Sequence, residues 1–279
     1  PSAKIGRIQG PVTDIDGCDI VIGMLQSLCM KTYHRSTFSG IGLLVVDECH
    51  HIPSEVFSRA MLKVVTKYTL GLSATMTRKD GLTSVLKMFL GDVIYKINRE
   101  KNPKVLVKLI SFKSNDPEFL EPVVDYRGKE MHSSMITKLC DHEPRNKFIY
   151  QVITTEFDLL EGQQILVLSQ NKSLLVYLDK ALANHGTISA GFYVGGMKRT
   201  DLEASEKKNI ILATYGMAAE GLDIVGLTTL VLGTPRTDIT QAVGRIFRTE
   251  HDRPLVVDIV DPHQCFNNQS RKRMKYYNK

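Results

Sequence analysis

The stretch Ile41-Gly42-Leu43-Leu44-Val45-Val46-Asp47-Glu48-Cys49-His50 decides the fold class of this chain. Its first six residues are typical of a strand that is buried on both faces of a parallel sheet. The two carboxylates that follow would then lie at the carboxyl edge of the sheet, where nucleotides bind in open α/β folds. One carboxylate can hold Mg²⁺ while its neighbour orients a water for attack on a γ-phosphate. A buried strand that ends in ordinary turn acids is the alternative interpretation.

Strand-like and helix-like segments alternate along the rest of the chain. We expect strands at residues 19–23, 68–72, 104–110, 164–168, 210–213, 229–232 and 255–258, and helices between them, for example at residues 55–67 and 145–160. This alternation predicts an α/β fold built on parallel sheets. A length of 279 residues is sufficient for two domains of ordinary size.

Three more motifs follow the acidic one in a definite order. They are Ser73-Ala74-Thr75, then Ile210-Ile211-Leu212-Ala213-Thr214 with Gly221-Leu222-Asp223, and finally Gln241-Ala242-Val243-Gly244-Arg245-Ile246-Phe247-Arg248. Together the four resemble motifs II, III, V and VI of superfamily 2 helicases, and the resemblance covers nearly the whole chain. Residues 73–81 and Val194-Gly195-Gly196 are similar to the XPB-like branch, including its relatives in large DNA viruses and phages.

The resemblance implies two RecA-like parallel-sheet lobes. Residues 1–98 would form a partial first lobe, residues 99–144 an inter-lobe segment, and residues 145–279 the second lobe with a basic tail. The implied activity is that of a helicase or translocase that uses ATP and Mg²⁺. Its partner would be DNA or RNA, contacted mainly through the phosphate backbone. DNA, with the machinery of transcription or DNA repair, is the first expectation.

The phosphate-binding loop of this class is absent from the sequence. No Gly-x-x-x-x-Gly-Lys-[Ser/Thr] occurs, and the single Gly-Lys pair, Gly128-Lys129, lacks the upstream glycine. Because that loop holds the β- and γ-phosphates, we interpret the chain, which begins at Pro1, as the remainder of a longer enzyme. Its first lobe would lack the P-loop strand, and the chain alone would be inactive.

Two alternatives to this interpretation stay open. One is a non-enzymatic nucleic-acid-binding module that has lost ATP binding, and a P-loop upstream of Pro1 would decide against it. The other is a translocase of a restriction or remodelling system, which no nuclease carboxylate cluster in the sequence favours.

The resemblance also assigns roles to individual residues. Asp47 would coordinate Mg²⁺ through water, and Glu48 would act as the catalytic base. Arg245 and Arg248 lie three positions apart, so on a helix they share a face, and they would act as catalytic arginine fingers. The other assignments are Gly221, Asp223 and Gln241 for nucleotide binding, His50, Ser73 and Thr75 for coupling, and Gln26, Ser27, Ser169, Gly195, Gly196 and Thr214 for nucleic-acid binding. The alternative for the small polar residues is an ordinary turn, and for the arginines a solvated basic helix face.

Composition narrows the class of protein further. A net charge of +6 and a pI near 9.0 suit a phosphate-backbone partner, and the basic residues after position 270 suggest a solvated tail. The five cysteines show no paired spacing, so neither a zinc site nor a disulfide framework is predicted. No apolar run approaches the ~18 residues that span a bilayer. We therefore expect an intracellular protein, nuclear in a cellular eukaryote, or in the host cytoplasm or virion if viral.

Overall fold

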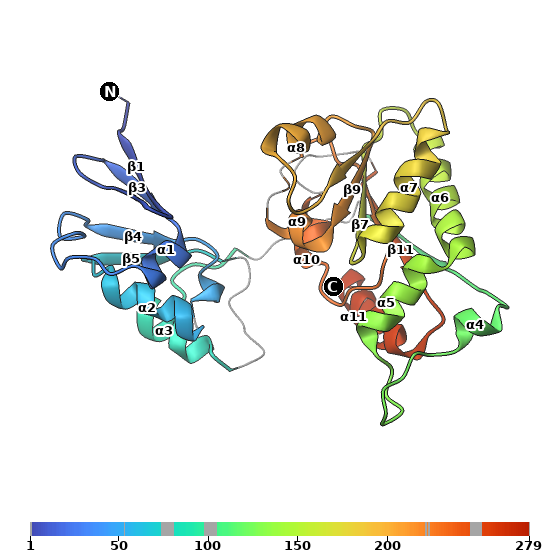
Figure 1. Cartoon of the computed structure of the whole chain (residues 1–279), viewed down its shortest axis with the longest axis horizontal. Helices are drawn as coiled ribbons and strands as arrows, with labels where there is room; N and C mark the ends of the chain where they lie inside the picture. The colour runs from blue at the N-terminus through green and yellow to red at the C-terminus, as the bar shows by residue number, and fades with distance from the viewer. Residues whose placement is uncertain are drawn as a thin grey trace. The chain divides into compact units, whose positions relative to one another are not determined.

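The chain folds into two compact units, Pro1–Arg99 and Glu100–Lys279. The computed structural model describes residues 2–52, 54–73, 81–97, 105–220, 222, 224–245 and 253–278 (Figure 1). Within these ranges the first unit has two sheets and the second has one, and each unit has its own buried apolar clusters.

The first unit contains two small sheets. One has the strand order β2-β1-β3, in which β1 pairs antiparallel with β2 and parallel with β3. The other is the parallel pair β4-β5. The elements of this unit are β1 (Ile5–Gln9), β2 (Val12–Asp14), β3 (Ile20–Gly23), α1 (Leu25–Met30), β4 (Leu43–Val46), the 3₁₀ turn η1 (Cys49–His51), α2 (Glu55–Lys63), β5 (Tyr68–Gly71) and α3 (Thr83–Leu90).

Strand β4 differs from the expectation for residues 41–46. We expected burial on both faces, but Leu43 and Val45 are 53% and 48% exposed. Their partners in register, Tyr68 and Leu70 of β5, are exposed on the same face. The expectation was wrong because, within the described residues, β4 pairs with one strand and packs on one face only.

The second unit is built on a parallel sheet of six strands in the order β6-β11-β10-β7-β9-β8. Its strands are β6 (Leu106–Ser111), β7 (Ile165–Ser169), β8 (Ala190–Tyr193), β9 (Ile210–Thr214), β10 (Thr229–Leu232) and β11 (Leu255–Val260). Its helices are α4 (Pro117–Leu120), α5 (His132–Asp141), α6 (Glu143–Asp158), α7 (Lys172–Ala183), α8 (Arg199–Ser205), α9 (Tyr215–Glu220), α10 (Thr240–Arg245) and α11 (Gln264–Tyr277). The α/β class with a parallel sheet is thereby confirmed.

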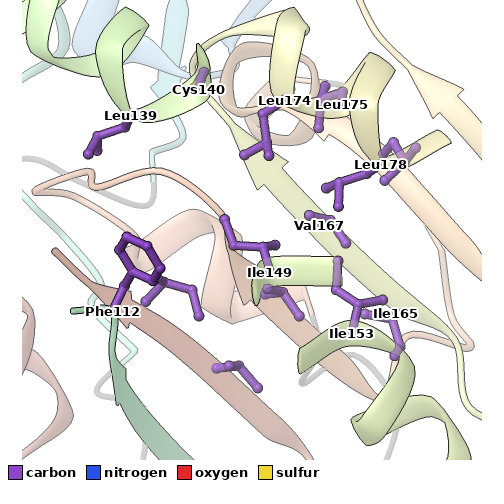
Figure 2. Close-up of a cluster of buried hydrophobic side chains, with 14 of the residues drawn as sticks. Phe112, Leu139, Cys140, Ile149, Ile153, Ile165, Val167, Leu174, Leu175 and Leu178 are labelled. Carbon is purple, nitrogen blue, oxygen red and sulfur yellow. The ribbon is translucent and has the colours of Figure 1, made fainter. Parts of the chain in front are cut away.

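Both faces of this sheet are covered, which explains its continuous apolar strands. Ile165 and Val167 of β7 pack in the cluster that includes residues of α5, α6 and α7 (Figure 2). The alternate residues, Leu166 and Leu168, pack in a second cluster with residues of α9 and α10. Each side chain is fully buried and contributes roughly 1.5–3 kcal/mol to folding. The sheet is therefore a stable base for the loops at its carboxyl edge.

Two parts of the second unit differ from the expected organisation. Strand β6 lies in the stretch 99–144 that we expected to separate the lobes, yet it pairs with β11 along its length and belongs to the second sheet. The expected basic tail is the ordered helix α11, in which Arg273 is only 1% exposed because it pairs with Asp258. In the described part of the chain, no helix is both long and apolar enough to cross a membrane.

Candidate active site and nucleic-acid interface

The acidic motif lies where the carboxyl ends of β4 and β5 meet. Two backbone bonds continue the pairing beyond the strands: Leu72 N–H donates to the Val46 carbonyl at 2.9 Å, and Cys49 N–H donates to the Leu72 carbonyl at 3.0 Å. Asp47 and Glu48 are both exposed at this edge. The Glu48 N–H donates to Oδ1 of Asp47 at 2.9 Å, which fixes one oxygen of that carboxylate.

Glu48 has an unusual backbone conformation. Its φ of 46° and ψ of 44° lie in the left-handed region, and it is the one non-glycine residue with positive φ among the described residues. For an L-residue this costs roughly 1–2 kcal/mol. Strain of this kind is commonly retained at functional sites, and here it turns the glutamate out of the strand at the start of η1.

His50 connects this glutamate to the end of β5. Its Nδ1 lies 3.2 Å from Oε2 of Glu48 and 3.0 Å from Oγ of Ser73. A protonated Nδ1 donates to the carboxylate, whereas an unprotonated Nδ1 accepts from the Ser73 hydroxyl. The protonation of one nitrogen therefore selects between the acidic motif and the Ser73 segment.

The close approach of β5 to η1 depends on Gly71. A Cβ at this position would lie 3.1 Å from Sγ of Cys49 and 2.5 Å from Cδ1 of Leu90. Cys49 itself is fully buried in the core of the first unit. A larger residue at 71 would therefore require the Leu90 and Cys49 side chains, which pack between β5, α3 and η1, to shift.

The exposed carboxylate of Asp47 is a suitable ligand for Mg²⁺. This hard cation prefers oxygen and commonly keeps several waters beside one or two protein carboxylates. Within the described ranges, no three His, Cys, Asp or Glu side chains are grouped to hold a metal ion. The exposed carboxylate of Asp47 fits an Mg²⁺ ion that keeps several of its waters.

The structure describes the remaining nucleotide-site residues only in part. Gln241 and Arg245 lie four positions apart in the helix α10, so their Cα atoms share one side of it. Their side chains are outside the described part of the structure. The expected residues Thr75, Gly221, Asp223 and Arg248 also lie outside the described residues.

In the second unit, three neighbouring strands end with the residues expected to bind nucleic acid. Ser169 of β7 lies opposite Thr214 of β9 in register, and β8, on the other side of β9, leads to Gly195 and Gly196. Thr214 is half-buried and both glycines are exposed, and Gly196 adopts a φ of 91°. These three strand ends form one continuous edge.

Ser169 contributes to this edge differently from what we expected. Its side chain is fully buried, and its hydroxyl donates to the Asn171 carbonyl at 2.7 Å and accepts from the Asn171 N–H at 3.1 Å. This placement favours a role in shaping the start of α7 over direct contact with nucleic acid.

Lys172 is a residue at this edge that the sequence analysis missed. It is the first residue of α7, and its Nζ lies 3.5 Å from the Gly195 carbonyl. A lysine directly after an asparagine that can cap a helix was the sequence signal that could have identified it. The basic side chain adds a positive charge beside the exposed glycine turn.

In the first unit, α1 carries the two expected nucleic-acid residues. Gln26 is exposed on the helix surface. The Oγ of Ser27 accepts from the Gly10 N–H at 3.0 Å, so it ties α1 to the turn between β1 and β2. The hydroxyl hydrogen remains available to donate to a phosphate. A groove of about 360 Å³ also lies over β1 and β3, but none of the predicted site residues line it.

Comparison with known proteins is consistent with this arrangement. Residues 5–81 match the DEAD/DEAH box helicase family. Over 99% of its length the chain is 37% identical to a protein of Acanthamoeba polyphaga mimivirus, and over 94% it is 27% identical to one of African swine fever virus. The names of both proteins propose an ATP-dependent RNA helicase. The chain spans 54% and 55% of these relatives, about half their length.

A solved structure shows the same fold. Yeast (S. cerevisiae) Dbp5, bound to RNA and ADP BeF3, superposes with a TM-score of 0.60 over 99% of this chain and 68% of its own. At 14% identity, this likeness establishes the fold and no more. The expected RecA-like architecture is confirmed.

Proposed function

We propose that this chain, which carries a superfamily 2, DEAD-box-like helicase domain with helicase homologues in viruses, belongs to an ATP-dependent helicase or translocase. The observation that carries the proposal is the position of His50 between Glu48 and Ser73. It joins the group that would act on ATP to the segment that would respond to nucleic acid. An XPB-like enzyme acting in transcription or DNA repair remains the finer form of this proposal.

The acidic motif supplies the chemistry that the proposal requires. The strained backbone of Glu48 holds its carboxylate out at the sheet edge, where it can orient a water toward a γ-phosphate and take its proton. Asp47 would hold Mg²⁺, which neutralises charge on the phosphates. Arg245 and Arg248 would stabilise the charge that develops on the transferred group.

The groups proposed to bind nucleic acid suit a phosphate backbone. Thr214, Lys172, Gln26 and Ser27 offer a hydroxyl, ammonium or amide donor, and the exposed turn at Gly195 offers backbone amides. Such contacts position a strand without reading its sequence. The XPB-like resemblance favours DNA, and the names of the viral relatives propose RNA. Binding should therefore tolerate sequence changes and weaken strongly with salt.

Phosphate release by the full-length parent protein tests the enzymatic proposal. Turnover should rise when single-stranded DNA or RNA is added, and the larger rise identifies the preferred strand. Glu48→Gln should lower turnover by at least about 10²-fold while ATP affinity stays nearly unchanged, because it removes general-base positioning alone. Glu161→Gln, the same change at an exposed position before β7, serves as the control.

Two outcomes would contradict the proposal. If Glu48→Gln turned over as fast as the control, Glu48 would not be the base. If the parent bound strands but hydrolysed no ATP, the non-enzymatic binding module would be the better description.

A further inference from the structure

Four consecutive backbone carbonyls after β10 each accept a hydrogen bond from a different side chain. Nη2 of Arg145 donates to Gly233 at 2.9 Å, and the hydroxyl of Tyr215 donates to Thr234 at 2.7 Å. Nε2 of Gln170 donates to Pro235, and Nη1 of Arg273 donates to Arg236 at 2.9 Å. The donors come from α6, α9, the β7–α7 connection and α11. We call residues 233–236, held in this way, the clamped loop.

The two arginine donors are themselves held by buried carboxylates. Arg145 makes two parallel bonds to Asp261, at 2.5 and 2.7 Å, and both side chains are fully buried. Arg273 makes two bonds to Asp258, at 2.7 and 2.9 Å, with both side chains 1% exposed. Bidentate pairs of this kind add geometric specificity as well as energy. The clamped loop is therefore held by groups that cannot easily shift.

The need to satisfy buried carbonyls accounts for part of this arrangement. Residues 233–235 are buried, so their carbonyls require donors. Arg236 is different, because its side chain is exposed while its carbonyl is held from within. The loop thus carries a guanidinium out to solvent from a rigid base.

The guanidinium of Arg236 also contacts an aromatic ring. Its Cζ lies 5.0 Å from the centre of the Tyr215 ring, within the range of a cation–π contact. Tyr215 is buried, and its hydroxyl is the group that bonds Thr234, so one tyrosine holds both the loop and the guanidinium. A cation–π contact uses none of the N–H groups of the guanidinium in hydrogen bonds, so these donors remain available. Among the described residues, no carboxylate forms an ion pair with it.

We propose that Arg236 binds a phosphate of the nucleic-acid backbone. Tyr215, on which it stacks, directly follows Thr214 at the edge formed by β7, β9 and β8. A guanidinium held beside that edge can donate two parallel N–H bonds to two oxygens of one phosphate group. This inference rests on the proposed function in one respect, that the edge is the nucleic-acid interface.

The experiment titrates a labelled single strand with the 279-residue chain by fluorescence anisotropy at several salt concentrations. Arg236→Ala should weaken binding at least about tenfold, the scale of a lost hydrogen bond to a charged group. The slope of log affinity against log salt should become shallower by about 0.7, as for one phosphate contact on a single strand. The variant should lose the same factor in affinity for strands of scrambled sequence, because a phosphate contact carries no sequence information.

Two further variants serve as matched comparisons. Arg236→Lys keeps the charge but loses the planar fork of donors, so it should keep most of the salt slope and lose only a few-fold in affinity. Arg253→Ala removes the same charge at an exposed position before β11, at the opposite edge of the sheet, and should bind like the wild type. None of the four clamping bonds uses the Arg236 side chain, so Arg236→Ala loses only the contact with the Tyr215 ring and should lower the thermal midpoint by no more than about 4 °C.

The outcomes distinguish a failure of the Arg236 assignment from a failure of the proposed nucleic-acid interface. If the wild-type chain binds strands and Arg236→Ala binds them equally well with the same salt slope, the role of Arg236 is refuted and the interface stands. If Arg236→Ala leaves strand binding unchanged and lowers only ATP affinity, measured with a fluorescent ATP analogue on the full-length parent protein, its role is also refuted. If the wild-type chain binds no strand, the proposed interface itself is wrong, and the inference falls with it.

Discussion

His50 and Ser73 are 23 positions apart in the sequence, yet Nδ1 of the histidine and Oγ of the serine are 3.0 Å apart at the edge of the β4–β5 sheet. The same nitrogen lies 3.2 Å from the carboxylate of Glu48. A change in the protonation of His50 or in the position of Glu48 therefore acts directly on the Ser73 hydroxyl.

This geometry predicts non-additive effects of His50→Ala and Ser73→Ala in the parent protein. Each substitution should reduce the stimulation of ATP turnover by nucleic acid, and the double variant should lose little more than either single variant. Residues in contact show interaction energies of about 0.5–3 kcal/mol in such cycles. Ser84→Ala, at an exposed position on α3, is the control. Strictly additive losses would show that the two side chains act independently.

The second unit should be better protected from hydrogen exchange than the first. β9 lies between β7 and β8, and residues 210–213 are fully buried. Among the described residues β4 pairs with β5 alone, and alternate residues of it are exposed. Amides in buried central strands open only on large-scale unfolding. Exchange measured by mass spectrometry should therefore be slower at residues 210–213 than at residues 41–46, and equal protection would contradict this reading of the first unit.

Breaking the pair between Arg145 and Asp261 should strongly destabilise the second unit. Both side chains are fully buried, and Arg145→Ala leaves a buried carboxylate without its partner, at a cost of about 3–5 kcal/mol. Replacing Arg145 by Met and Asp261 by Leu together should recover only part of that loss: no unpaired charge remains, but the buried Gly233 carbonyl still lacks its donor. Urea unfolding measures both effects.

The control for this pair is Arg199→Ala, which breaks an exposed ion pair with Glu203 on α8. Surface pairs contribute little because solvent screens them, so this variant should unfold like the wild type. A similar loss in both variants would mean that burial of the Arg145–Asp261 pair is not what matters.

The stability of the second unit should decrease as the pH falls below about 6.5, the ordinary value for histidine. Phe119 of α4 packs between two imidazoles, with ring centroids 4.1 Å from His142 and 4.8 Å from His263. Burial is the main cause that lowers the pKa of both histidines, and the positive charges of Arg145 and Lys138 lower it further. Nearby carboxylates partly offset this decrease. They are Asp116 at His142, and Asp261 and Glu130 at His263.

The sign follows from proton binding by the two states. Below a pH of about 6.5 the unfolded chain binds protons at these histidines more readily than the folded chain does. Unfolding is therefore favoured as the pH falls, and the full stability is present above that pH. Urea midpoints across this range should fall toward acid pH, and His263→Gln should flatten the dependence. His185→Gln, outside the Phe119 cluster, should leave it unchanged. A wild-type midpoint that does not vary with pH would contradict the prediction.

The regular elements of the second unit were largely predictable from the sequence. Residues 229–232 were expected as a strand and form β10, because an apolar run covered on both faces is recognisable locally. Strand β8, which contains Gly191, was not among the expected strands. Its glycine serves close packing: a Cβ there would lie 3.0 Å from the Cα of Ser205 on α8. That contact is non-local and leaves no local signal.

The candidate site was predictable in its residue types and less so in their surroundings. The motif order identified Asp47, Glu48, His50 and Ser73, and the structure brings the last three together. The motif order could not show that the Ser169 hydroxyl forms its hydrogen bonds inside the protein.

The sequence by itself determined the parallel α/β class and the order of the motifs, because helix and strand periodicity and short motifs are properties of neighbouring residues. Only the tertiary structure decided which charges are buried. Arg273, expected in a solvated tail, pairs with Asp258 inside the protein, whereas Arg236 reaches solvent from a loop held by four distant side chains. The physical reason is that burial and charge pairing depend on contacts between residues far apart in the chain.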